Sequence, residues 1–207
     1  MFWGGVAKVE KEKLSFSKVM GVLGGVNIDP EAARRRRQFQ KDVGGKLKTR
    51  FTNGQFAREI NLVSRAFDQF DITARIDFAH IERDRARFFE VKMRDFFKDQ
   101  DVLQALFDVS AMRNDRVYGR MVHSLMFMYG EHVTGEVDVD GLTSLEHLLL
   151  PMGEAVLGIL ECGRSRDRND SLRAIELRND LDLTYRRLLD EGRDRVRGVE
   201  ADAHFHG

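Results

Sequence analysis

The chain has 207 residues, of which 34 are Lys or Arg and 34 are Asp or Glu, so its formal net charge is zero. A content of 42% hydrophobic residues is sufficient for one compact domain with a real core. Cys162 is the only cysteine, which excludes an intrachain disulfide framework, and no apolar run approaches the roughly 20 residues that cross a bilayer.

Residues 1–29 are expected to form an N-terminal arm. Met1, Phe2 and Trp3 are large and apolar, and the glycines that follow argue against one long rigid element. Phe2 and Trp3 are candidate docking residues for a protein partner, and the alternative is a frayed terminus folded against the core. Lys8 precedes any apolar segment, so no signal peptide is expected.

The rest of the chain predicts helices, because prolines are few and β-branched residues form no alternating runs. Pro30 is well placed to start the first helix, Gly44 and Gly45 should end or bend it, and Pro151 should kink or split a later one. The expected helices are 30–43, a long Phe-rich segment at 55–98, 101–112, 115–132, 145–160 and 171–199.

The predicted fold is therefore all-α, an irregular multi-helix bundle of five to seven helices. Residues 30–200 are expected to form a single helical domain, preceded by the arm at 1–29 and followed by a flexible tail at 201–207.

Charge is segregated along the sequence. Residues 31–50 hold eight Lys or Arg against two acidic residues, whereas 99–161 hold three Arg against eleven acidic residues. This asymmetry suits contact within the chain, head-to-tail self-association, or a basic face for a polyanion. The candidate nucleic-acid-binding residues are Arg34, Arg35, Arg36, Arg37, Lys41, Lys46, Lys48 and Arg50.

The stretch GEVDVDGLTSLEHLLLP at 135–151 is a candidate cation site. Glu136, Asp138 and Asp140 occupy alternate positions before Gly141, as the first three ligands of a calcium loop do. The last acidic residue, Glu146, falls one position too early for the twelfth ligand. A tight turn followed by a capping box from Thr143 to Glu146 explains the same residues without a metal.

No complete catalytic set is apparent, and no phosphate loop or nucleophile motif is present. Asp77, His80 and Asp84 would share one side of a helix, where ion pairing with neighbouring arginines explains them better than a metal does. No cofactor is expected, and the sequence favours a protein that is not an enzyme.

The sequence favours a non-enzymatic assembly or adaptor protein that acts through helix-mediated contacts with a protein partner or with itself as a homo-oligomer. A nucleic-acid-associated protein that uses residues 34–50 is the alternative, and a divalent-metal-binding protein that uses 136–146 is a third. The expected location is the cytoplasm, or a particle assembled inside the cell.

Overall fold

The computed structural model describes residues 11–24, 30–94, 96–130, 133–164 and 167–196. The predicted docking residues Phe2 and Trp3 and the predicted tail at 201–207 lie outside these described residues. The helices and strands, in chain order, are β1 (Glu12–Ser15), α1 (Phe16–Gly24), α2 (Pro30–Arg50), β2 (Gln55–Ser64), β3 (Phe70–Glu82), β4 (Arg85–Lys92), α3 (Gln100–Asn114), β5 (Val122–Tyr129), β6 (Val133–Val137), α4 (Val139–Thr143), the 3-10 helix η1 (Glu146–Leu148), α5 (Leu149–Cys162) and α6 (Arg168–Val196).

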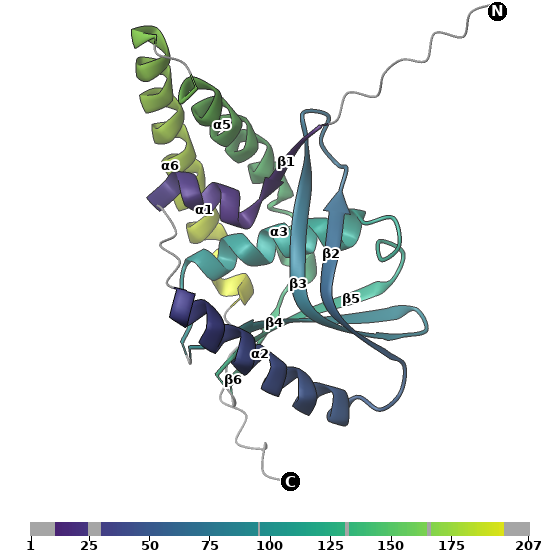
Figure 1. Ribbon diagram of the computed structural model, residues 1–207. Helices are drawn as coiled ribbons and strands as arrows, with labels where there is room; N and C mark the ends of the chain where they lie inside the picture. Colours follow the sequence, from purple (N-terminus) through teal and green to yellow (C-terminus); the bar gives the residue numbers. More distant parts are fainter. Residues whose placement is uncertain (1–10, 25–29, 95, 131–132, 165–166, 197–207) are drawn as a thin grey trace, which may run out of the picture.

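The prediction of an all-α helical bundle is wrong, because the described residues form a six-stranded mixed sheet with helices on both faces (Figure 1). The predicted Phe-rich helix at 55–98 is instead the antiparallel meander β2-β3-β4. The predicted helix at 115–132 is a turn followed by β5, which runs parallel to β4 after the crossover through α3.

The strands follow the order β1-β3-β4-β5-β6, and β2 pairs with the other edge of β3. β1 runs parallel to β3 and β6 antiparallel to β5. Residues 11–24 of the predicted arm thus contribute a strand and a helix, and Leu14 and Val19 are fully buried in the main core.

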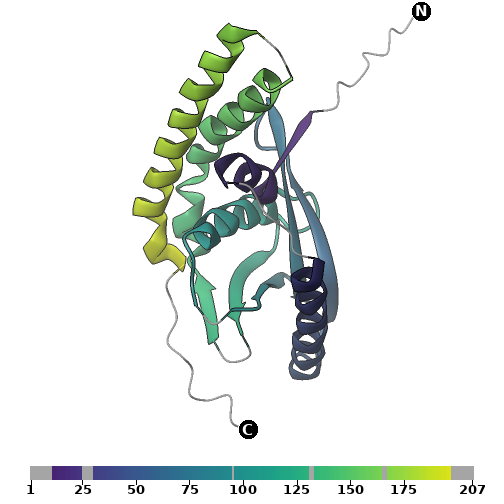
Figure 2. The same ribbon diagram turned by 60° about the vertical axis from the view of Figure 1, so that its left-hand side comes forward.

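Two hydrophobic cores lie on opposite faces of the sheet. The larger core joins the sheet to α3, which also packs against α6, and α5 and α6 form an antiparallel pair beyond it (Figure 2). The smaller core joins Val43 and Leu47 of α2 to Phe78, Phe89 and Val91 of the sheet. Because α2 has only this one apolar edge, its other sides are left to charged residues.

Helix α2 begins at Pro30, as predicted, but it continues through Gly44 and Gly45 to Arg50. Gly44 lies against the ring of Phe78, where a Cβ atom would come within 2.5 Å of a ring carbon. The glycine therefore allows a close approach of helix to sheet. At the other end of the chain, the predicted helix at 145–160 is divided between η1 and α5, with Pro151 in the first turn of α5.

The predicted helices at 101–112 and 171–199 are confirmed as α3 and α6, with small differences at their ends. None of the helices within the described ranges is both long enough and apolar enough to span a bilayer.

Candidate metal-dependent site at the fork between β3 and β4

The sheet opens where β3 and β4 separate. β4 pairs with β3 only over residues 78–82, and β1 occupies the same edge of β3 over 70–73. Residues 74–77 of β3 therefore face a fork in the sheet. A change in side-chain alternation marks the same place, because Ile76 packs in the larger core whereas Phe78, two residues later, packs in the smaller one.

Asp77 lies at this fork and is held from both sides. Its Oδ2 accepts a hydrogen bond of 2.9 Å from the backbone N–H of Val91, and its Oδ1 accepts one of 2.7 Å from Nε2 of Gln40 in α2. The backbone N–H of Asp77 donates to Oε1 of Glu90 at 3.3 Å. The two carboxylates are therefore fixed beside each other by strand and helix.

Glu90 and Lys92 alternate on β4 and so point to the same face of the sheet, towards α3. Their exposed fractions are only 1% and 6%. Lys92 Nζ lies 3.6 Å from Glu90 Oε2, and Gln104 of α3 bridges the pair: its Nε2 donates to Glu90 at 2.6 Å, and its Oε1 accepts from Lys92. Hydrogen bonds to Gln104 and the ion pair between Glu90 and Lys92 therefore replace the water that both buried side chains have lost.

Burial and like charge both act on the acids here. The pKa of Glu90 is raised from 4.5 to about 7, first by burial and then by the negative charge of Asp77, while the positive charges of Lys92 and Arg36 act in the opposite direction. Burial also raises the pKa of Asp108 in α3 well above its usual range, as does the charge of Glu90. Asp108 Oδ2 has no hydrogen-bond partner among the described residues. Three carboxyl groups therefore lie close enough to oppose one another's ionisation, and a bound cation would favour their ionised forms.

The donor set suits a hard divalent cation. Carboxylate oxygens from Asp77 and Glu90 are the ligands that magnesium prefers, and magnesium usually takes only one or two carboxylates, with water and phosphate oxygens completing the shell. No group of three His, Cys, Asp or Glu side chains that could hold a metal is found among the described residues. A cage made only of protein ligands, as zinc prefers, is not formed there.

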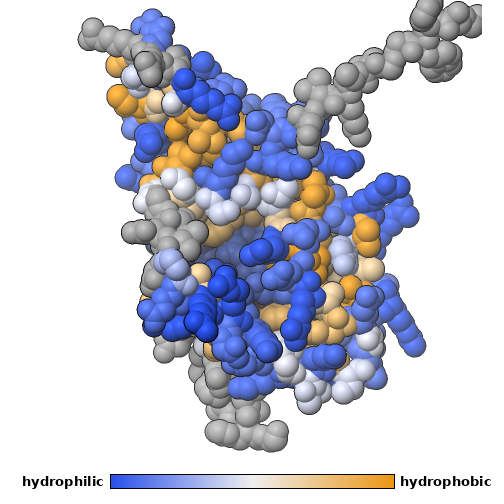
Figure 3. All heavy atoms as spheres, viewed as in Figure 1, coloured by the Kyte–Doolittle hydropathy of each residue, from blue (hydrophilic) through white to orange (hydrophobic). Residues whose placement is uncertain are grey.

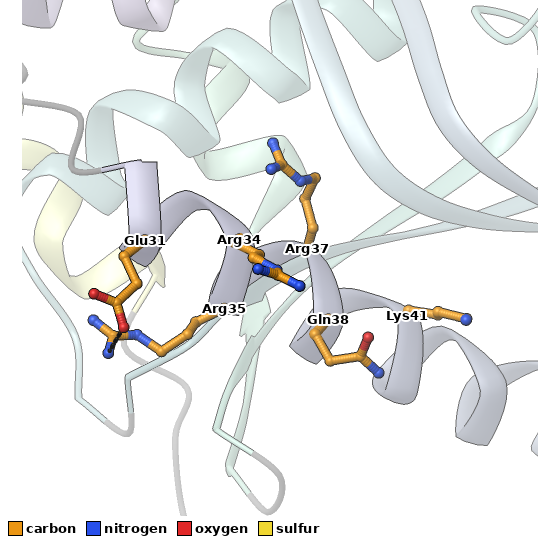
Figure 4. A pocket seen from close by; sticks show the side chains of 6 residues that line it. All are labelled: Glu31, Arg34, Arg35, Arg37, Gln38 and Lys41. Carbon is orange, nitrogen blue, oxygen red and sulfur yellow. Dashed lines mark hydrogen bonds and ion pairs between the residues drawn. The ribbon is translucent and has the colours of Figure 1, made fainter.

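The predicted basic segment is placed on α2, next to this fork. Arg34, Arg35, Arg37 and Lys41 are exposed and line a shallow hollow with Glu31 and Gln38, and Arg35 pairs with Glu31 at 3.4 Å (Figure 4). The molecular surface over α2 is mainly hydrophilic (Figure 3). Arg36 acts on Glu90, and Gln40, one turn later, reaches Asp77. Arg36 is exposed as well, so α2 contributes to the site through Arg36 and Gln40 while it carries exposed cations on several sides.

The remaining residues of the predicted basic segment lie further along α2. Lys46, Lys48 and Arg50 are exposed on the C-terminal half of the helix, and Arg50 lies 6.0 Å from the ring of Phe51. The helical spread of the cations means that they do not form a single face.

The predicted cation ligands Glu136, Asp138 and Asp140 line a second hollow. Glu136 is exposed, and the carboxylates of Asp138 and Asp140 have protein partners. Asp138 caps α4 by accepting 2.8 Å from the N–H of Gly141 and also accepts from Arg195, and both contacts lower its pKa. Asp140 pairs with Arg113 at 3.0 Å. The capping box predicted from Thr143 to Glu146 is not formed, because Thr143 ends α4 and its hydroxyl donates to the carbonyl oxygen of Val139 at 2.7 Å. Neither η1 nor α5, which follow, has a side-chain cap.

His80 and Asp84, which the sequence placed beside Asp77 on a helix, are separated from it by the strand geometry. His80 contacts the carbonyl oxygen of Asn53 and stacks on Phe51 with ring centroids 4.8 Å apart. Asp84 lies in the turn between β3 and β4. Of the three residues, only Asp77 reaches the fork.

Sequence reasoning missed Glu90, Lys92 and Gln104. An indication was available, since Glu90 and Lys92 flank Val91 within the otherwise apolar run from Phe88 to Met93. Charged residues at alternate positions of a buried strand require partners, and such residues are candidates for function.

Comparison with known proteins gives no identification. No family model, no curated protein and no solved structure matches the chain. Its function must be inferred from the geometry of the site.

Proposed function

We propose that this protein is a divalent-metal-dependent hydrolase of phosphodiester bonds in nucleic acid. The observation that carries the proposal is the convergence of Asp77, Glu90 and Lys92 at the fork between β3 and β4. Two fixed carboxylates and one buried ammonium group form a set suited to phosphoryl transfer, which depends on positioning and charge neutralisation.

Each side chain has a distinct role in this proposal. Asp77 and Glu90 would hold the cation, and a cation held there would supply Lewis-acid chemistry to the phosphate and to a bound water. Lys92 Nζ, 3.6 Å from Glu90, donates to a phosphate oxygen and stabilises the negative charge that develops there. Gln104 positions both residues, because it hydrogen-bonds Glu90 and Lys92 at once.

The polyanionic substrate is supported by the neighbouring helix. Gln40 connects α2 to Asp77, and the exposed residues Arg34, Arg37 and Lys41 lie within two turns of it. A nucleic-acid strand that binds these cations through its phosphates is positioned close to the fork. A small phosphorylated metabolite would not require so many separate cations.

A cleavage assay tests the proposal directly. The purified chain is incubated with labelled single-stranded DNA, duplex DNA and RNA in magnesium, in manganese, and in EDTA. We expect shortened products in magnesium or manganese and none in EDTA. No product with any nucleic acid in either metal, at protein concentrations that saturate binding, would contradict the proposal.

Assembly through protein contacts is a second candidate function, supported by a separate feature. Leu172, Ile175 and Leu183 of α6 are 58%, 57% and 63% exposed and share one side of the helix. Light scattering tests this role. A concentration-dependent rise in mass that Leu183→Glu abolishes would support it, and a monomer at all concentrations would contradict it.

A further inference from the structure

The turn between β4 and α3 presents two large apolar side chains to solvent directly after the strand that carries Glu90 and Lys92. Met93 is 47% exposed and Phe96 is 56% exposed. A partner that covers an exposed phenylalanine ring removes apolar surface from water, which favours binding. Its place beside the proposed site makes it a candidate for substrate contact.

The turn holds Phe96 outward by a buried ion pair. Asp101, only 1% exposed, accepts from Arg94 Nη2, from the backbone N–H of Lys98 at 3.0 Å and from the Tyr129 hydroxyl at 3.1 Å. Arg94 Nε also donates to the carbonyl oxygen of Phe96 at 3.1 Å. The carbonyl group of Phe96 is therefore bound by the same arginine that pairs with Asp101.

A cation accompanies the exposed ring. Lys98 Nζ lies 5.5 Å from the centroid of Phe96. An aromatic face beside an ammonium group matches the two parts of a nucleotide, since the base stacks on the ring and the cation meets the phosphate. A purely apolar protein contact would not need the lysine at this position.

The short connection along the chain limits the distance between Phe96 and the proposed site at Lys92. Phe96 lies four positions after Lys92, so their Cα atoms are at most roughly 14 Å apart. A base on Phe96 therefore belongs to a nucleotide near the phosphate at Lys92, not to a distant part of the substrate.

We propose that Phe96, together with Lys98, stacks an unpaired base of the nucleic-acid substrate close to the phosphate bound at Glu90 and Lys92. This inference rests on the proposed function and adds its substrate class: single-stranded nucleic acid, or a frayed end or junction, in preference to continuous duplex. In a continuous duplex the faces of the bases are already covered by their neighbours, so the ring has nothing to stack on.

Equilibrium binding in EDTA tests this class, because no cleavage occurs there. Fluorescence anisotropy compares a single strand of about twelve nucleotides with a blunt hairpin duplex of the same sequence. We expect Phe96→Ala to weaken binding of the single strand about ten-fold and to change duplex binding less than about two-fold. Phe96→Trp should retain the affinity of the wild type. Val117→Ala, at an apolar residue that is 65% exposed, is the matched control and should have no effect.

Three results for Phe96→Ala would overturn the inference. The first is unchanged binding of the single strand, and the second is equal weakening of single-strand and duplex binding. The third is a lower mass of the variant in light scattering with unchanged affinity for nucleic acid. The last result would assign the ring to a protein contact. Failure of the proposed function is distinguishable. Binding that depends on Phe96 without cleavage in any metal contradicts only the hydrolase, and cleavage with binding independent of Phe96 contradicts only the stacking.

Discussion

The backbone N–H of Val91 donates a hydrogen bond of 2.9 Å to the Asp77 carboxylate, so a side chain replaces the strand partner at the point where β3 leaves β4. The last backbone pair before the fork is Phe78 with Phe89. Val91 lies between Glu90 and Lys92, and this one bond therefore sets the position of Asp77 relative to both. The acids and the lysine are placed by the sheet itself, and a site on such rigid elements is preorganised.

Cation affinity should depend on pH through Glu90. Its pKa of about 7 means that the carboxyl group is mainly protonated at pH 6 and mainly ionised at pH 8. A cation binds only the ionised form, so the affinity for Mn²⁺ should be about ten-fold higher at pH 8 than at pH 6. Electron paramagnetic resonance of free Mn²⁺ measures this directly, and an affinity that is equal at both pH values would contradict it.

Stability without metal should show the opposite trend. The folded pKa of Glu90 lies above the value of 4.5 that applies to the unfolded chain, so the folded state binds more protons between those values and loses stability as pH rises through about 7. Glu90→Gln removes this loss. In EDTA at pH 8, urea unfolding should find the variant more stable than the wild type, by about 3 kcal/mol at most. A variant less stable than the wild type would contradict this expectation, because it would show that ionised Glu90 does not destabilise the folded protein.

Lys92→Met tests the role of the ammonium group. The variant keeps the apolar stem but removes the charge, so kcat should fall about a hundred- to a thousand-fold while KM changes little. Because the charge of Lys92 lowers the pKa of Glu90, the pH–rate profile should also move to higher pH. A rise in KM with unchanged kcat would assign Lys92 to substrate binding alone.

The exposed arginines of α2 should govern the salt dependence of binding. Changing Arg34, Arg35 and Arg37 together to Gln should reduce the slope of log K against log salt by about 2 to 3, with little change in the cleavage rate at saturation. Arg173→Gln, at an exposed residue of α6, is the control and should leave the slope unchanged. An unaltered slope in the triple variant would remove α2 from the binding surface.

The two glycines of α2 should respond oppositely to substitution. A Cβ on Gly44 would lie 2.5 Å from Phe78, whereas a Cβ on Gly45 meets nothing within 4 Å. Gly44→Ala should therefore destabilise the fold by about 1–3 kcal/mol, and Gly45→Ala should stabilise the helix by up to about 1 kcal/mol. Thermal unfolding compares them, and equal effects would contradict the close approach of α2 to the sheet.

The helices were predictable where caps and charge define them, and the strands were not. Pro30 marks the start of α2, and the charged pattern of 171–199 marks α6. The segment FDITARIDF at 70–78 satisfies two periods at once: Phe70, Ala74 and Phe78 step by four, while Phe70, Ile72 and Ile76 lie at multiples of two. The prediction used only the helical period, and it therefore assigned one helix to the residues that form β2, β3 and β4.

A similar ambiguity hid β5. Its sequence VHSLMFMY is apolar almost throughout, because both faces of that strand are covered, and periodicity alone cannot separate a buried strand from a buried helix.

The site could not be assembled from local spacing, since thirteen positions separate Asp77 from Glu90 and fourteen separate Glu90 from Gln104. Only the β3–β4 hairpin and the crossover to α3 bring these residues together. The basic segment at 34–50 was recognisable from charge alone, and its use for nucleic acid stays a prediction.

The proposed function requires that Glu90 acts in cation-dependent hydrolysis. A comparison of cleavage rates between variants tests this requirement. The rate of cleavage of a labelled single strand in magnesium is measured for the wild type, for Glu90→Gln and for Glu82→Gln, whose exposed carboxylate lies on the neighbouring strand β3. We expect the rate to fall at least about a hundred-fold in Glu90→Gln and to stay at the wild-type value in Glu82→Gln. Cleavage by Glu90→Gln at the wild-type rate would contradict it.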